Sequence, residues 1–186
     1  SFPDMAAVAE YRARCRVSFP YLPGFLAFRE GPALLACFRQ VAEEVDLVFF
    51  NGHGTAHPRA CGLACHLGVL LDVASIGVAK SLLHGRYSEP PSFAGASTFV
   101  HNKEGDTIGH CLRTAGGSLL FVSPGHRIDL RGALSLNWRA SVPANPFRFL
   151  STVHTGRAGK PARVRPEAPV FDGVPRGEYN ISLQGP

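Results

Sequence analysis

Residues 46–58, DLVFFNGHGTAHP, run from an apolar segment into a turn that is rich in glycine and histidine. An acidic residue at the end of such a segment would suit a metal site, because Mg²⁺ prefers hard carboxylate oxygens and water. The residue at this position is Asn51, whose amide offers one neutral oxygen in place of a charged carboxylate. The stretch leaves three readings open at this point: an active site, the remains of one, or neither.

Histidine and cysteine spacings in and after this turn are weak metal signatures. His53 and His57 form an HxxxH pattern, but no Glu follows the first His as it does in zinc hydrolases. Cys61 and Cys65 lie four residues apart, beside His66, in a segment with helical spacing. Small residues at this spacing usually pack inward, so structural roles are favoured over a metal site.

Strands and helices must position this turn. Residues 9–19 alternate apolar and basic side chains, which is typical of an exposed or edge strand. The segment 31–45 has Pro32 near an expected helix start, and its apolar residues follow helical spacing at positions 34, 35, 38, 41 and 45. DLVFF is expected to be a strand covered on both faces. Residues 58–68 are expected to form a second helix, and GVLLDVASIGVA another buried strand.

The second half of the chain continues this alternation. TIGHCLRT and SLLFVS are expected to pair as a hairpin, and the residues after SPGH to enter a helix with Asp129 near its start. Strands that alternate with helices predict an α/β fold whose sheet is at least partly parallel. From residue 141 the periodicity is lost, and residues 141–186 are predicted to be a Pro-, Gly- and Arg-rich extension of a domain at residues 1–140.

Composition narrows the class of protein. With 186 residues, 45% hydrophobic and 18% charged, the chain fits one folded domain. No apolar run approaches the roughly 20 residues that span a bilayer. Five cysteines without a disulfide-like pattern predict a reducing intracellular compartment, the mitochondrial matrix being one candidate. The net charge of +5 comes mostly from arginine, which binds phosphate with two hydrogen bonds, although genome composition gives the same bias.

Four segments in order resemble one known family. They are FPYLPGFLAFREGPALL, DLVFFNGHGTAHPR, DVASIGVAKSLLHG and LFVSPGHRIDL. Together these segments resemble endonuclease V, a metal-dependent nuclease that cuts near deoxyinosine in DNA or inosine in RNA. The resemblance implies a ribonuclease H-like fold, with a mixed sheet flanked by helices. The family's first hairpin, which carries one acidic residue, has no counterpart in this sequence.

The resemblance also implies a set of site residues. Glu30 matches a carboxylate of the family, and Asn51 stands where the family has a metal-binding Asp. His57 and Lys80 match positions in the phosphate and metal region. Nucleic-acid contacts are expected from a wedge that enters the duplex and from a later motif: Pro20, Tyr21, Leu22, Pro23, His126 and Arg127. A single carboxylate facing a histidine and a lysine suits an anion better than Mg²⁺.

Two functions follow as hypotheses. The favoured one is a catalytically inactive protein, without a cofactor, that serves as a structural or RNA-binding subunit of a larger assembly such as an organellar ribonucleoprotein. RNA and protein subunits would then be its partners, and a partner or a separate segment would cover an exposed sheet edge. The alternative is an active Mg²⁺-dependent nuclease, with Glu30 among its metal ligands. A third suggestion is that the Asn51-Gly52 pair deamidates and restores a carboxylate.

Overall fold

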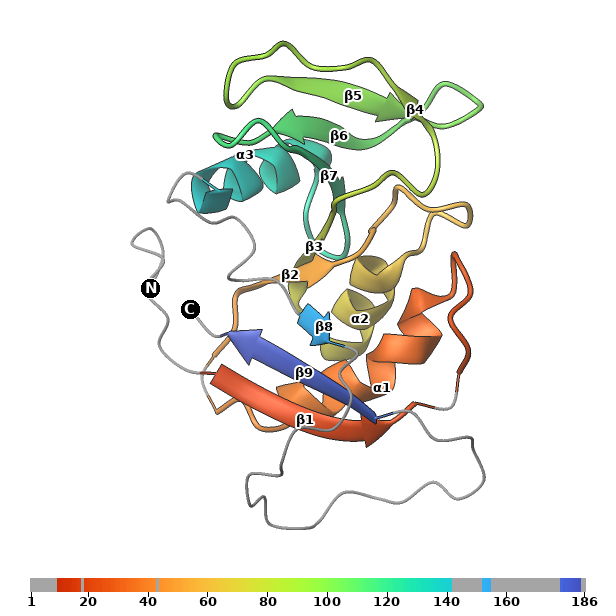
Figure 1. Cartoon of the computed structure of the whole chain (residues 1–186), viewed down its shortest axis with the longest axis vertical. Coiled ribbons are helices and arrows are strands. Elements are labelled where there is room, and N and C mark those ends of the chain that lie inside the picture. The colour runs from red at the N-terminus through yellow and green to blue at the C-terminus, as the bar shows by residue number, and fades with distance from the viewer. Residues whose placement is uncertain (1–9, 18, 43, 142–151, 155–177, 185–186) are drawn as a thin grey trace.

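The computed structural model describes residues 10–17, 19–42, 44–141, 152–154 and 178–184. These residues form two sheets with helices between and beside them (Figure 1). The larger sheet has the order β2-β3-β7-β6-β5-β4. Its strands are β2 (Leu47–Asn51), β3 (Ala74–Ala79), β4 (Arg86–Tyr87), β5 (Ser97–His101), β6 (Thr107–Arg113) and β7 (Leu119–Pro124). Strands β2 and β3 are parallel and the other pairs antiparallel, which confirms the expected mixed sheet.

Three helices within the described residues cover this sheet: α1 (Leu26–Phe38), α2 (Leu63–Leu71) and α3 (Leu130–Ser141). On one face Val48 and Phe50 of β2 pack with side chains of α1 and α2 such as Leu34. On the other face Ile76 of β3 packs with Ala133 of α3. Strand β2 is therefore covered from both sides, as its continuous apolar run predicts.

Helix α1 begins earlier than its sequence pattern predicts. Pro32 lies inside the helix and not at its start, and the helix ends before positions 41 and 45. Proline has no N–H to donate to the carbonyl four residues earlier, so the turn containing it needs other support. The aromatic rings of Phe19, Phe25 and Phe28 pack pairwise beside the start of this helix, with centroids 5.8–6.1 Å apart.

The boundary between α2 and β3 also differs from the expected one. The segment GVLL, expected to begin a strand, forms the last turns of α2, and Asp72 ends this helix in the left-handed conformation. Ser75 then joins β3 to α2 and to the segment after β7, because its hydroxyl donates to the carbonyl of Ala64 and accepts the N–H of His126. Gly68 must lack a side chain, since a Cβ atom there would lie 2.1 Å from this hydroxyl oxygen.

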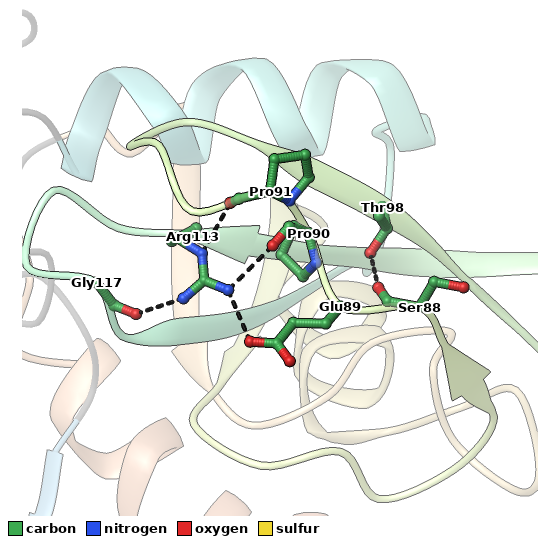
Figure 2. A network of polar contacts seen from close by, with 7 residues as sticks. All are labelled: Ser88, Glu89, Pro90, Pro91, Thr98, Arg113 and Gly117. Carbon is green, nitrogen blue, oxygen red and sulfur yellow. Dashed lines mark hydrogen bonds and ion pairs between the residues drawn. The ribbon is translucent and has the colours of Figure 1, made fainter.

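The predicted hairpin of β6 and β7 is confirmed by their antiparallel pairing. Figure 2 shows how Arg113, at the end of β6, joins this hairpin to the loop before β5. Its guanidinium donates to the carbonyls of Pro90, Pro91 and Gly117 and to the Glu89 carboxylate, over distances of 2.9–3.0 Å. One side chain thus fixes two loops of the sheet. Strands β4 and β5 themselves were missed by the sequence pattern.

A second sheet has the order β1-β9-β8 and contains β1 (Glu10–Arg16), β8 (Thr152–His154) and β9 (Glu178–Gln184). Strand β1 confirms the expected edge strand, and all seven of its residues pair antiparallel with β9. Strands β8 and β9 belong to the extension that was expected to be irregular. Most of residues 141–186 lies outside the described residues, so the predicted domain boundary stays a prediction. One edge of β1 is covered by this same chain.

Candidate functional site

The loop of Pro20, Tyr21, Leu22 and Pro23 connects β1 to α1 and is held at its base. Phe25 donates its N–H to the carbonyl of Leu22 at 3.0 Å. The ring of Tyr21 is 68% exposed, although it sits between two prolines on a braced loop. We name residues 20–23 the wedge loop.

A pocket of about 180 Å³ lies at the base of the wedge loop. Three separate segments form its wall: the start of α1, the turn after β2 with the start of α2, and one residue after β3. The lining is largely apolar, with histidine and arginine side chains among it. It consists of Gly24, Leu26, Ala27, Phe28, His53, His57, Arg59, Cys61, Gly62, Leu63, His66 and Leu83.

Gly52 brings the backbone after β2 against two leucines of this pocket. A Cβ atom at this position would lie 3.1 Å from Cδ2 of Leu63 and 3.3 Å from Cδ2 of Leu26. These contacts are tighter than ordinary van der Waals packing, so a larger residue would push the leucines inward. A residue with a Cβ atom after Asn51 would therefore require Leu26 and Leu63 to shift by a few tenths of an ångström.

His57 is buried in the pocket wall, and both of its ring nitrogens have partners. Nε2 donates to the carbonyl oxygen of Gly24 at 3.0 Å, and Nδ1 accepts the backbone N–H of Arg59 at 3.2 Å. Burial lowers the pKa of His57, the Gly24 carbonyl opposes this shift, and the positive charge of Arg59 adds to it. His57 is thus a neutral imidazole: its one N–H bonds to Gly24, and the lone pair on its other nitrogen accepts from Arg59.

His53 also contributes to the pocket wall as a neutral imidazole. Burial lowers its pKa to about 4, against the effect of a hydrogen bond between Nε2 and the carbonyl of Ser81 at 3.1 Å. Nε2 donates in this bond, so Nδ1 carries a lone pair. Nδ1 is buried and has no hydrogen-bond partner among the described residues.

Glu30, Asn51 and Lys80 lie outside the pocket lining. Glu30 is on α1, where burial raises its pKa to about 7 although Arg29 beside it acts in the opposite direction. Asn51 is the last residue of β2 and pairs with Val78 of the parallel strand β3. Lys80 follows β3 directly and is exposed. Asn51 and Lys80 therefore lie at the same end of two adjacent strands.

These residues do not fit a Mg²⁺ ion by themselves. The described part of the chain contains no group of three or more His, Cys, Asp or Glu side chains placed to hold a metal. Glu30 supplies one carboxylate and Asn51 a neutral amide, whereas Mg²⁺ retains its water unless carboxylates replace it. No reaction step through a metal can be derived from this set.

His126 and Arg127 lie apart from the pocket. Both contact Asp72 at the C-terminal end of α2, His126 through Nε2 at 3.4 Å and Arg127 through Nη2 at 2.8 Å. The pocket uses the N-terminal end of the same helix, and a helix of nine residues is about 13 Å long. The structure therefore gives these two side chains a contact with α2, and their role in nucleic-acid binding stays a prediction.

Sequence reasoning missed most of the pocket. It singled out His57 and the wedge loop but not Gly24 and Arg59, which adjoin them in the sequence and meet them in the structure. The only signal was their position directly after the motifs PYLP and HP.

Comparison with known proteins decides the family. The family model for endonuclease V matches residues 1–145. The chain belongs to the endonuclease V family. Its similarity to curated members is high: it is 46% identical over 135 residues to endonuclease V of Roseiflexus sp. strain RS-1, and 47% identical over 121 residues to that of Kosmotoga olearia.

Solved endonuclease V structures share the fold. The Streptomyces avermitilis protein is 41% identical, with a TM-score of 0.63 over 68% of this chain and 56% of that one. The catalytic domain of human endonuclease V is 32% identical, with a TM-score of 0.71 over 78% of this chain and 66% of that one. These matches confirm the expected mixed sheet flanked by helices.

The matched region is a part of the curated relatives. It covers 72% of this chain and 60% of the Roseiflexus endonuclease V, and 64% of this chain and 54% of the Kosmotoga protein. The chain thus spans somewhat more than half the length of these endonuclease V proteins.

The favoured function from the sequence is wrong. The chain was expected to be a catalytically inactive structural or RNA-binding subunit, but the relatives that match it are named as the enzyme endonuclease V. Nothing in these matches indicates an inactive protein, a ribonucleoprotein subunit or a mitochondrial one. Asn51 removes negative charge at one position of the site, and such a local change is no evidence for a different kind of protein.

The cofactor and the partners of this chain stay proposals, because the chain spans only part of the length of these relatives. Membership of the endonuclease V family is consistent with Mg²⁺ as the cofactor of an active chain. Solved neighbours of the same fold bind DNA, and protein and RNA subunits as partners are not shown. No helix in the described ranges has the length and apolar character to cross a membrane.

Proposed function

We propose that this chain is the base-recognising part of a Mg²⁺-dependent endonuclease V that cleaves DNA or RNA near inosine. The observation that carries the proposal is the junction of the exposed wedge loop with the pocket at its base. Both features lie within residues 1–145, which match the endonuclease V family.

The pocket and the wedge loop fit the needs of single-base recognition. An altered base inside a duplex must leave the stack before a protein can read its edges. A pocket of about 180 Å³ with apolar walls accepts one flat heterocycle. The exposed ring of Tyr21 provides a flat surface that stacks on the neighbouring base.

A protein of the same fold supports the substrate class. Endonuclease V of Ciona intestinalis, 24% identical with a TM-score of 0.64 over 75% of this chain and 67% of that one, has been solved with a 24mer DNA containing an inosine followed by a ribo-adenosine. For this chain, Lys80 at the end of β3 supplies a positive charge for the backbone phosphate. Glu30 is the carboxylate available to a metal.

We also propose that the protein resides in a reducing intracellular compartment. All five cysteines are free thiols in the structure, which supports a reducing intracellular compartment. The mitochondrial matrix stays a prediction.

The proposal is tested with the full chain and with matched pairs of oligonucleotides, in both DNA and RNA. The two members of a pair differ at one position, which carries either inosine or guanosine. Binding is measured by fluorescence anisotropy without metal, and strand cleavage by gel electrophoresis with Mg²⁺. We expect preferential binding of the inosine strand, and an interaction weaker by about fivefold or more after Tyr21→Ala, because a stacked base contributes about 1–3 kcal/mol.

The matched control is Phe93→Ala, since Phe93 is 66% exposed and lies far along the chain, in the loop before β5. This variant should bind as the unchanged protein does. Equal affinity for inosine and guanosine strands, together with no cleavage of either, would refute the proposed function.

A further inference from the structure

Two side chains of the turn after β2 converge on one carbonyl oxygen. Nε2 of His57 donates to the oxygen of Gly24 at 3.0 Å, and Nη2 of Arg59 donates to the same oxygen at 2.5 Å. The guanidinium carbon of Arg59 also lies 4.3 Å from the ring centroid of Phe25. His57 and Arg59 thus contact two consecutive residues, Gly24 and Phe25, which directly follow the wedge loop.

The backbone of the turn holds these two donors in place. The N–H of Arg59 donates to Nδ1 of His57, which leaves the ring proton on Nε2, where it points to Gly24. The N–H of Ala60 donates to the carbonyl of His57 at 2.8 Å, and Ala60 has a positive φ of 50°. The turn is therefore tight, and Arg59 sets the tautomer of His57 as well as making its own contact.

Gly24 connects the wedge loop to the pocket wall. It lines the pocket, and it directly follows Pro23 of the wedge loop. Its φ is +80°, so it is the residue at which the chain bends between this loop and α1. Gly24 therefore belongs to the pocket wall and is joined directly to the wedge loop.

We propose that Arg59, acting with His57 on the carbonyl of Gly24, is a positioning residue that sets the width of the base pocket and so its selectivity for inosine over guanosine. The inference rests on the proposed function, since it assigns a determinant of selectivity to that site. The chemical reason is the size of the base: guanine differs from hypoxanthine by one exocyclic amino group, and a pocket wall fixed at one distance excludes that group.

Arginine and lysine differ at this position in a way that makes a sharp test. The planar guanidinium donates to Gly24 and lies over Phe25 at the same time, whereas an ammonium group is a compact point charge without a planar face. Arg59→Lys is therefore expected to keep part of the selectivity, and Arg59→Ala to lose most of it.

The experiment measures, without metal, the affinities of the full chain for an inosine strand and for the matched guanosine strand. We expect Arg59→Ala to lower the ratio of the two affinities by about tenfold, which is the effect of one lost charge-assisted hydrogen bond. Affinity for the inosine strand itself should fall less than this ratio. Arg59→Lys should give an intermediate ratio.

The control is Arg86→Ala, which removes the same charge from an exposed position on β4. It should leave the ratio unchanged. Hydrogen exchange of the Phe25 amide, monitored in free protein by mass spectrometry, should become faster in Arg59→Ala and not in Arg86→Ala. An unchanged ratio in Arg59→Ala, an equal fall in Arg86→Ala, or unchanged exchange at Phe25 would each overturn the proposal.

Failure of the proposed function is distinguishable from failure of this inference. If the unchanged chain shows no preference for the inosine strand, the proposed function fails, while the exchange measurement still decides whether Arg59 holds Gly24.

Discussion

The backbone N–H of Gly52 donates to the carbonyl oxygen of Val78 at 3.0 Å, and also to that of Phe50 at 2.9 Å. Deamidation of Asn51 requires this same nitrogen to attack the Asn51 side chain. In the folded protein the nitrogen is buried and bonded to two acceptors, so the attack is suppressed. The Asn-Gly pair, which suggests easy conversion to a carboxylate from sequence alone, is protected by the register of β2 and β3.

We therefore predict that Asn51 deamidates slowly in the folded chain and much faster in denaturing urea. Mass spectrometry of peptides containing position 51, after parallel incubation at pH 8, measures the conversion. Equal rates in the folded and unfolded protein would show that the bonds to Val78 and Phe50 give no protection.

A carboxylate at position 51 should create affinity for Mg²⁺. The substitution Asn51→Asp adds a second hard anionic ligand to Glu30, so Mg²⁺ should raise the melting temperature of the variant more than that of the unchanged chain. A ligand at about 100 times its dissociation constant stabilises the fold by about 2.7 kcal/mol. Differential scanning fluorimetry with and without Mg²⁺ measures this difference.

The control for this prediction is Glu30→Gln in the Asn51→Asp background. It should abolish the added response to Mg²⁺, because one carboxylate is again lost. An identical Mg²⁺ response in all three proteins would mean that positions 30 and 51 do not share an ion.

Removal of Arg113 should destabilise the loops shown in Figure 2. Its side chain is only 14% exposed and donates to three backbone carbonyls, so Arg113→Ala should lower the free energy of unfolding by about 2–3 kcal/mol. Urea denaturation followed by circular dichroism measures the change. Glu89→Gln is the matched variant, since the Glu89 carboxylate is 74% exposed, and it should cost less than about 1 kcal/mol. Equal losses in the two variants would contradict the role of the carbonyl bonds.

His110 should make the fold less stable in acid. Burial lowers its pKa from 6.5, and its Nε2 has no hydrogen-bond partner among the described residues. Below pH 6.5 the unfolded chain binds a proton that the folded chain does not, so stability falls from pH 6.5 down to the pKa of the folded state. His110→Phe should reduce this fall, measured by urea denaturation at pH 7 and pH 5. Histidines 53 and 57 have lowered pKa values as well, so part of the fall should remain. A variant with an unchanged pH dependence would rule out this role for His110.

The sequence predicts the elements whose signal is local. The continuous apolar run of β2, the alternation in β1 and the turn between β6 and β7 are all confirmed, and Asp129 accepts the N–H of Gly132 at the start of α3 as expected. The predicted start of α1 was wrong because Pro32 indicates a helix start locally, whereas the helix begins at Leu26 and contains this proline.

The site required information that is not local. Its pocket combines residues near 24, 57 and 83, and only folding brings these segments together. The motif HPR marks His57 as a residue that could do chemistry, but its type does not reveal that both ring nitrogens are bonded to protein atoms. Strand β9 alternates apolar residues at 179, 181 and 183 with polar ones, a strand signal that the sequence analysis missed, whereas its pairing with the remote strand β1 has no local signal.

This pairing has a consequence for how the chain acquires its structure during synthesis. Residues 10–16 leave the ribosome early, but their hydrogen-bonding partners are residues 178–184. Strand β1 therefore cannot pair with β9 until residues 178–184 have been synthesised, and contacts of such high sequence separation form slowly. We therefore expect the pairing of β1 with β9 to form after the more local contacts of the six-stranded sheet.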